Sequence, residues 1–292
     1  MPTSTPCASP VMRNEMDLTA YATPPTVAAI YDHYARNRKD AHRPHLGGSQ
    51  IGHECKRALW YQFRHMARAE IDGRVLRLFE TGDREEARIV ANLRAVGVTV
   101  WDRDPETGKQ IRFTAHDGHF ALSLDGVGEG FKESGQPHTL EFKTMNDKNF
   151  RATASKGVQE VKPVYWAQCQ IGMHLAGLER CAFIAVNKNT DDIYMERIRY
   201  DAAEALQLLA KAGEVIWSDK PPERLSNDPA WWQCKFCDYH AICHRGKPPE
   251  VNCRTCAHAT PERGGDGAWS CAKGQTFGET CKMHLFNPYA MP

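Results

Sequence analysis

Three polar residues in the middle of the chain have types and a spacing that could carry out metal-assisted hydrolysis. Asp125 ends one predicted strand, and Glu141 and Lys143 lie inside the next. Alternate side chains of a strand point to the same face, so Glu141 and Lys143 share a face at a spacing of about 7 Å, while Leu140 and Phe142 point into a core. If the two strands pair, Asp125 reaches the face that carries Glu141.

Two carboxylates side by side repel each other unless a cation lies between them. Oxygen ligands of this kind suit Mg²⁺ or Mn²⁺, and a lysine beside a metal-bound water can orient that water for attack on phosphorus. The alternative for an acid-x-lysine triplet is a solvated strand face with a weak ion pair, which is the commoner case for a triplet considered alone. The rest of the sequence has to decide between these two interpretations.

The chain has eleven cysteines, most of them near its C-terminal end. One group forms a C-x2-C-x5-C triplet: Cys234, Cys237 and Cys243. The candidate for a fourth sulfur is Cys55, far upstream, and four thiolates suit zinc or a four-iron cluster equally well by ligand type. Such a centre would tie the two ends of a domain together. A zinc site could instead take His240 or His244 as its fourth ligand.

A second group of four cysteines is close together in sequence: Cys253, Cys256, Cys271 and Cys281. The segment that carries them has little apolar content, so it cannot bury enough core to fold alone. A structural zinc would supply the missing stability, with His258 and His284 as substitute ligands. Because the N-terminus does not read as a secretory signal, we expect a reducing compartment, where clustered cysteines bind metal more often than they pair. A disulfide is the alternative.

Composition excludes several classes of protein. With 292 residues, 41% hydrophobic and 25% charged, the chain is typical of a soluble globular protein. Its net charge is +1, so any binding of nucleic acid must come from local patches. Residues 56–77 are rich in Lys and Arg, but such a run is more often a solvated helix face. No apolar run is long enough for a membrane span, and we expect no membrane association and a cytoplasmic location.

Hydrophobic periodicity predicts alternating helices and strands. Residues 1–24 are predicted to be disordered. Helices are expected over residues 25–38, from Ser49 to Phe63 with Cys55 on that helix, and over residues 74–96, 148–157, 163–178 and 201–218. Strands are expected at residues 98–101, 110–114, 180–187 and 193–200, besides the two strands that carry Asp125 and Glu141. This order predicts an α/β domain over residues 25–245 and a small module over residues 250–292, joined by a proline-rich linker.

The pattern as a whole resembles the PD-(D/E)XK nuclease superfamily over roughly residues 49–243. It is most similar to RecB-like and lambda-exonuclease-like members that carry an iron–sulfur staple, as AddB and the CRISPR-adaptation nuclease do. The matching motifs are S-x-D-G at residues 123–126, E-x-K at residues 141–143, the glycine-then-acid stretch at residues 82–86, the glutamine helix at residues 165–170, and the spacing of Cys55 and the triplet. The implied fold is α/β, a restriction-endonuclease-like core with a central mixed sheet flanked by helices, plus a small C-terminal metal-binding module.

The resemblance also implies roles for single residues. It assigns Mg²⁺ or Mn²⁺ ligands to Glu86, Asp125, Glu141 and the carbonyl of Phe142. It places Lys143 on the attacking water, and Gln168 would orient Lys143, a phosphate or the water. RecB-like members usually carry histidine in place of Glu86, which points to the phage exonuclease branch and, for a phage protein, to the cytoplasm of a bacterial host.

The implied cofactor of Cys55, Cys234, Cys237 and Cys243 is a 4Fe–4S cluster. The implied function is a divalent-metal-dependent DNA exonuclease acting in recombination, replication or repair. Its partners would be DNA and a single-strand annealing or recombination protein, and a homo-oligomer is an analogy with the phage enzyme. A non-catalytic DNA-binding or scaffold protein on the same fold is the alternative, and a redox-sensing iron–sulfur protein is a second one.

Overall fold

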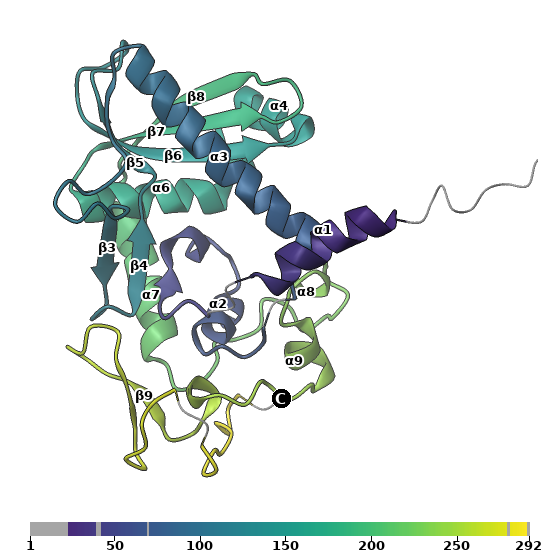
Figure 1. Cartoon of the computed structure of the whole chain (residues 1–292). Coiled ribbons are helices and arrows are strands. Elements are labelled where there is room, and N and C mark those ends of the chain that lie inside the picture. Colours follow the sequence, from purple (N-terminus) through teal and green to yellow (C-terminus); the bar gives the residue numbers. More distant parts are fainter. Residues whose placement is uncertain (1–22, 39–41, 69, 279–280, 291–292) are drawn as a thin grey trace, which may run out of the picture. The chain divides into compact units, whose positions relative to one another are not determined.

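The computed structural model describes residues 23–38, 42–68, 70–278 and 281–290 (Figure 1). Of these, residues 23–38 and Ile71–Leu78 form a smaller compact unit, and the remaining residues form a larger one. The smaller unit contains helix α1 (Pro25–Arg36) and the first residues of α3 (Gly73–Ala95). The stretch predicted to be disordered lies, apart from Thr23 and Pro24, outside the described residues. Within the described ranges, no helix combines the length and the apolar character needed to cross a bilayer.

A five-stranded mixed sheet is the centre of the larger unit. Its strands are β2 (Thr99–Trp101), β5 (Gly126–Glu129), β6 (His138–Met145), β7 (Arg180–Asn187) and β8 (Ile193–Arg199), in the order β2-β5-β6-β7-β8. The pair β6 and β7 is parallel, and the other neighbours are antiparallel. The predicted α/β class, with a mixed sheet flanked by helices, is therefore confirmed.

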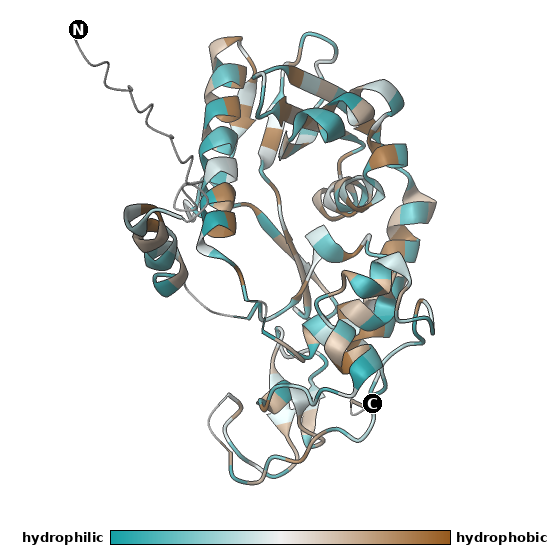
Figure 2. Ribbon diagram, turned by 90° about the vertical axis from the view of Figure 1, so that its right-hand side faces the viewer, coloured by the Kyte–Doolittle hydropathy of each residue, from teal (hydrophilic) through white to brown (hydrophobic). Residues whose placement is uncertain are grey.

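The two faces of this sheet are covered by different helices. From Phe79 onward, α3 packs Ile89 and Val90 on the face that carries Leu140 and Phe142. The opposite face of β7 packs against α4 (Asp147–Lys156), α5 (Val158–Val161) and α6 (Pro163–Ala176). Hydrophobic and hydrophilic residues alternate along α3 in Figure 2, as expected for a helix with one packed face.

A second, three-stranded sheet has the order β1-β4-β3, from β1 (Leu46–Gly47), β4 (Phe120–Ser123) and β3 (Arg112–Ala115). The predicted pairing of the strand before Asp125 with the Glu141 strand is therefore wrong. Strand β4 pairs with β3 and β1, and it is β5, beginning at Gly126, that pairs with β6. The physical reason is that the chain changes sheets at Asp125, because both sheets need a strand from this segment to complete their cores.

Cys55 is not on a helix, contrary to the prediction. The segment after β1 forms a short 3-10 turn, η2 (Gly48–Gln50), and helix α2 begins only at Lys56 and ends at Phe63. Cys55 is the residue before the first helical one and has an extended backbone. Its amide donates to Nδ1 of His53, so the loop, and not a helix, sets the direction of this cysteine.

The C-terminal part packs on the larger unit through helix α7 and a group of short elements. These are α7 (Ala202–Trp217), α8 (Trp232–Lys235), α9 (His240–Arg245), η3 (Cys253–Thr255), β9 (Ala259–Pro261) and β10 (Trp269–Cys271). Strands β9 and β10 form an antiparallel pair. Trp269 of this pair and Ala290 are buried in one core cluster with Trp60 and Phe63. The segment after residue 250 therefore shares its core with the rest of the unit.

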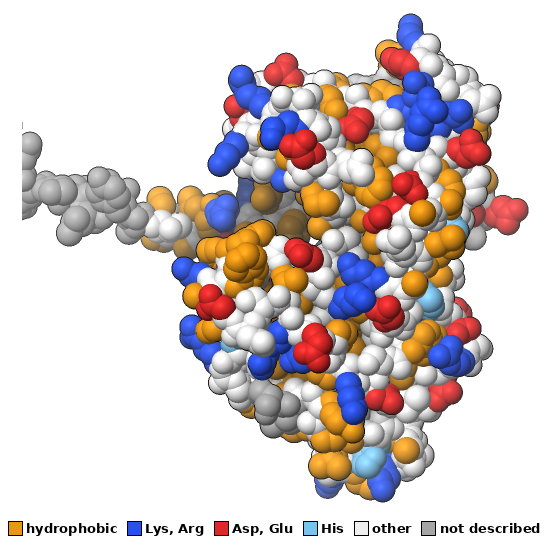
Figure 3. All heavy atoms as spheres, turned by 180° about the vertical axis from the view of Figure 1, so that it is seen from behind, with side chains coloured by type: hydrophobic (Ala, Val, Ile, Leu, Met, Phe, Trp, Pro, Cys, Tyr) orange, Lys and Arg blue, Asp and Glu red, His pale blue; other side chains and the backbone are white. Residues whose placement is uncertain are grey.

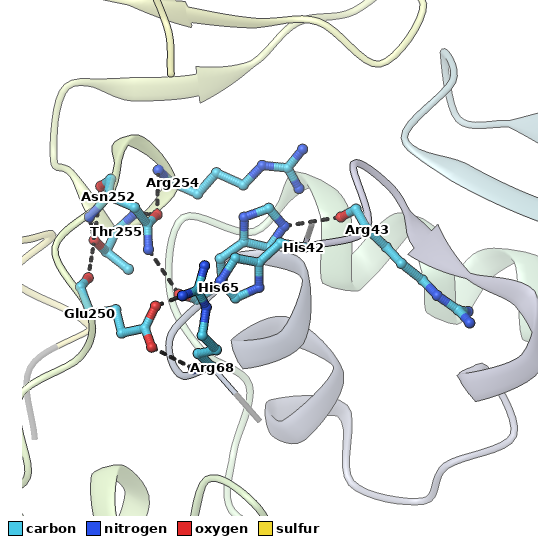
Figure 4. Close-up of polar contacts among 8 residues, drawn as sticks. All are labelled: His42, Arg43, His65, Arg68, Glu250, Asn252, Arg254 and Thr255. Carbon is cyan, nitrogen blue, oxygen red and sulfur yellow. Dashed lines mark hydrogen bonds and ion pairs between the residues drawn. The ribbon is translucent and has the colours of Figure 1, made fainter. Parts of the chain in front are cut away.

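Arg254 ties that segment to α2. Its guanidinium donates to the carbonyls of Phe63 and Pro44, at 2.9 and 2.6 Å, and lies 4.7 Å from the centre of the Trp269 ring. Burial lowers the pKa of Arg254 to about 10, and the charge of Arg64 adds to the effect. In Figure 4 the neighbouring Asn252 donates to the carbonyl of His65, so the start of η3 is fixed on both sides.

We predict that Arg254→Ala lowers the free energy of unfolding by about 2–4 kcal/mol, because two buried carbonyls lose charge-assisted hydrogen bonds. Urea unfolding followed by circular dichroism would measure the change. The control is Arg245→Ala, which removes an exposed arginine and should leave stability nearly unchanged. Equal stability of both variants would show that Arg254 does not fix the C-terminal segment.

Candidate active site

The site lies where the chain passes from one sheet to the other. Asp125 is the single residue between Leu124 and the first residue of β5, and its carboxylate accepts a hydrogen bond from the amide of Phe142 at 2.6 Å. Gly126 allows this crossing, because a Cβ there would lie 2.9 Å from the carbonyl oxygen of Trp101. Asp125 therefore reaches β6 through its own backbone path and not through strand pairing.

Strand β6 supplies the other two charged groups. Glu141 is almost fully buried, with 3% of its surface exposed, and its carboxylate forms an ion pair with the ammonium of Lys143. The intervening Phe142 packs in the cluster on the opposite face with Leu140, as the alternation of a strand requires. The structure thus brings Asp125, Glu141 and Lys143 together, as the sequence predicted.

Helix α6 covers this face and adds two groups. The side-chain amide of Gln168 donates to the second carboxylate oxygen of Glu141 at 2.8 Å, so the buried glutamine has the partner that burial demands. The ring of Tyr165 lies 5.2 Å from the Lys143 ammonium, within the range of a cation–π contact. Sequence reasoning assigned no role to Tyr165. The available signal was its position three residues before Gln168, which puts both on one helix face.

Glu86 approaches from α3 and is half-buried. It is near enough to the other groups for the charges of Asp125 and Lys143 to act on its pKa. Gly82 lies one turn earlier on the same helix face, and a Cβ at Gly82 would have no atom within 4 Å. The helix surface beside Glu86 is therefore open rather than packed.

Burial governs the charges of the site. It raises the pKa of Glu86 to about 7, with the charge of Asp125 adding to the rise. It also raises the pKa of Glu141 to about 7, although Lys143 opposes the shift, and it raises the pKa of Asp125. Burial alone would lower the pKa of Lys143, but the charges of Glu141 and Asp125 outweigh it and raise that pKa above its ordinary value. The carboxyl groups thus lack compensating positive charge.

No three His, Cys, Asp or Glu side chains in the described residues are arranged closely enough around one point to hold a metal ion. The chemistry of the donors nevertheless fits a divalent cation, since three acids converge on one place with a single ammonium between them. Oxygen donors of this kind are those that Mg²⁺ and Mn²⁺ prefer. A bound cation would also relieve the repulsion that raises the pKa values of these acids.

The four cysteines predicted for the first centre line one cavity. Cys55, Cys234, Cys237 and Cys243 surround it together with His53, His240 and His244. Burial raises the pKa of Cys234, and the charges of Cys55 and Cys243 raise it further, which shows that these sulfurs are near one another. His240 is engaged through Nδ1 with the carbonyl of Cys234. The donor set fits a metal centre that closes the chain between Cys55 and the triplet.

The four C-terminal cysteines, Cys253, Cys256, Cys271 and Cys281, line a second cavity, and His284 lines it too. Two of the sulfurs accept backbone hydrogen bonds, from Gly278 to Cys253 at 3.2 Å and from Met283 to Cys281 at 3.3 Å. Such contacts suit thiolate ligands, whose charge needs support from outside the metal. The ten cysteines in the described part of the chain are all free of disulfides, so the disulfide alternative has no support there.

No protein-family model matches the chain, and neither does any curated protein. Three solved structures overlap with it at low identity. A protein described as SSO0001 is 15% identical with a TM-score of 0.43, covering 74% of this chain and 92% of its own. LHK-Exo in complex with dAMP is 18% identical with a TM-score of 0.44, covering 63% and 90%. LHK-Exo described as an alkaline exonuclease from Laribacter hongkongensis is 17% identical with a TM-score of 0.41, covering 64% and 90%. Overlaps of this quality leave the function to be argued from the site.

The raised pKa of Glu86 predicts a dependence of stability on pH. Its folded-state pKa, about 7, lies above the ordinary value of 4.5, so the folded protein binds more protons between these values and stability falls as pH rises through this window. Without added Mg²⁺ or Mn²⁺, Glu86→Gln should be more stable than wild type at pH 8, by about 1 kcal/mol after allowance for solvent screening.

Urea unfolding at pH 5 and pH 8 would measure this difference, which should be much smaller at the lower pH. Glu129→Gln replaces an exposed glutamate and serves as the control, with no change expected at either pH. A Glu86→Gln variant that is no more stable than wild type at pH 8 would contradict the assignment of a strained carboxylate.

Proposed function

We propose that this chain is a divalent-metal-dependent deoxyribonuclease, an exonuclease that hydrolyses DNA phosphodiester bonds in recombination, replication or repair. One observation carries the proposal: Asp125, Glu141, Lys143 and Gln168 are joined in one network where two sheets and α6 meet. The E-x-K and S-x-D-G motifs supply the chemical class, through their resemblance to the PD-(D/E)XK nucleases. A solvated strand face would not bury its glutamate or provide it with a glutamine partner.

Asp125, Glu141 and the carbonyl of Phe142 would hold one Mg²⁺ or Mn²⁺ ion, and Glu86 would complete that site or reach a second ion. Such an ion acts as a Lewis acid toward the phosphate and lowers the pKa of a bound water. The raised pKa values of Glu86 and Glu141 are consistent with this role, because these acids are stabilised as anions once positive charge is added. We therefore expect the metal-free site to take up the ion with release of protons.

Lys143 would orient the attacking water and offset negative charge that develops on the phosphate. Its raised pKa keeps the ammonium charged throughout the neutral range, so it acts as an electrostatic group and hydrogen-bond donor. Gln168 holds the second oxygen of Glu141 in place, and the Tyr165 ring restricts the ammonium from the side of α6. The open surface at Gly82 leaves room for a DNA strand beside Glu86.

The two groups of cysteines would hold separate structural metals. We assign a 4Fe–4S cluster to Cys55, Cys234, Cys237 and Cys243, and zinc to Cys253, Cys256, Cys271 and Cys281, on the cavities that each group lines. Their domains would be residues 25–245 and 250–292. The phage origin, a cytoplasmic location, an annealing or recombination partner and a homo-oligomer stay predictions from the sequence.

We predict that Lys143→Ala lowers the rate of cleavage of end-labelled linear duplex DNA with Mg²⁺ by at least about 100-fold, because the water and the phosphate lose their positive group. Lys148→Ala removes an exposed lysine five residues later and should cleave at the wild-type rate. Circular dichroism would establish that both variants are folded, and the position of the label in the products would give the polarity.

Wild-type protein, purified anaerobically, that binds this DNA but cuts none with Mg²⁺ or Mn²⁺ would overturn the nuclease proposal. That result would favour the alternative of a non-catalytic DNA-binding or scaffold protein on the same fold. Cleavage by Lys143→Ala at the wild-type rate would instead remove the lysine from the mechanism.

The assignment of the two metals makes separable predictions for metal content. In anaerobically purified protein, Cys234→Ser should lose iron and acid-labile sulfide but keep zinc, because the second group of cysteines is untouched. Cys253→Ser should lose zinc and keep iron. Cys169→Ser, at a buried cysteine outside both cavities, should keep both. Elemental analysis of these variants that found zinc alone in wild type would replace the iron–sulfur assignment at Cys55 with a second zinc site.

A further inference from the structure

A polar groove lies beside the first cysteine cavity and is separate from the carboxylates of the proposed active site. It has a volume of about 140 Å³ and is lined on one side by Gln50, His53 and Gln62, and on the other by Phe236 and Asp238. This is many times the 10–15 Å³ or so that one water needs. The groove therefore has room for a polar group much larger than a single water.

The groups in this groove have unused binding capacity. The side-chain amides of Gln50 and Gln62 have no hydrogen-bond partner within the part of the chain that the structure describes. His53 accepts the amide proton of Cys55 at Nδ1, so its Nε2 is left to donate when the ring is neutral. Phe236 is 78% exposed, which is unusual for so large an apolar side chain. The groove thus combines hydrogen-bonding amides with a free aromatic face.

This combination does not suit a phosphate. No lysine or arginine is among the residues that line the groove, and the carboxylate of Asp238 is there instead. On the face of the molecule shown in Figure 3, acidic and basic side chains are interspersed, so no broad basic surface compensates on that side. A flat, neutral ligand with donors and acceptors on its edge fits better, because amides read base edges and aromatic rings stack on base faces.

We propose that this groove binds one unpaired nucleobase of the DNA substrate, stacked on Phe236 and hydrogen-bonded by Gln50 and Gln62. The inference rests on the proposed nuclease function and adds to it a preference for DNA that contains a single-stranded portion. It also gives the first metal centre a use, since Phe236 and Asp238 flank Cys237, and a metal held by that cysteine would fix both side chains.

The groove is connected to the active site through packed structure. The segment between Gly48 and His53 forms its inner wall and lies on α6: a Cβ at Gly52 would come within 2.8 Å of the Ala167 Cβ. Ala167 precedes Gln168, which holds Glu141. A base in the groove and a phosphate at the carboxylates would thus contact opposite sides of the same packed layer.

The test measures DNA binding with Ca²⁺ in place of Mg²⁺, by fluorescence anisotropy of labelled oligonucleotides and full-length protein. Phe236→Ala should bind single-stranded DNA about tenfold more weakly than wild type, the loss expected for one stacked base, and should bind blunt duplex as wild type does. Gln62→Leu should show a smaller loss with the same selectivity. Trp232→Ala, which removes an exposed aromatic residue near Phe236 that does not line the groove, is the matched control and should bind like wild type.

A scan with a single abasic site moved along the oligonucleotide identifies the base. One position should weaken binding by wild type about tenfold and have no further effect on Phe236→Ala, because both changes remove the same contact. Equal iron and zinc contents of all the variants would show that the loss does not come from a damaged metal centre.

A flat abasic scan, or wild-type affinity of Phe236→Ala and Gln62→Leu for single strands, would overturn the base-binding groove while leaving the nuclease function standing if wild type cuts DNA. Wild-type protein that neither binds nor cuts any form of DNA would overturn the groove and the proposed function together.

Discussion

The burial of the Glu141 carboxylate beside Lys143 is the constraint on which the rest of the larger unit depends. A buried carboxylate is costly unless each oxygen has a partner. Here one oxygen pairs with Lys143 and the other accepts from Gln168. The lysine itself needs the acids, since their charge outweighs its own loss of hydration. Each group is tolerated in the interior because the others are present.

This mutual dependence explains the arrangement of the surrounding elements. Strand β6 has to lie inside the sheet to bury Glu141, and its parallel pairing with β7 is made possible by the helices that connect the two strands. Helix α6 has to lie across the same face to bring Gln168 and Tyr165. The change of sheet at Asp125 brings a third charged group to β6 without using a position on that strand. The site is thus assembled from one strand, one crossing point and two helices.

The C-terminal segment solves a different problem. It has little apolar content of its own, yet Trp269 enters the core beside Phe63 and the guanidiniums of Arg64 and Arg254 lie 5.0 and 4.7 Å from the Trp269 ring centre. Buried arginines without a buried acid are stabilised here by carbonyls and aromatic faces. The segment is therefore held by the larger unit as well as by any metal its cysteines bind, and residues on both sides of position 250 belong to one compact unit.

Local pattern determined a large part of this protein. Strand β7 has the predicted bounds, helix α6 begins at the predicted proline, and the period of two put Glu141 and Lys143 on one face with Phe142 on the other. These features depend on neighbours in sequence, whose geometry the backbone fixes. Tertiary structure decided that Asp125 arrives by a change of sheet, that Cys55 lies in a loop beside the triplet, and that Tyr165 lies over Lys143. Those outcomes depend on which distant surfaces pack together, and a periodic pattern states only that a face is buried, not what covers it.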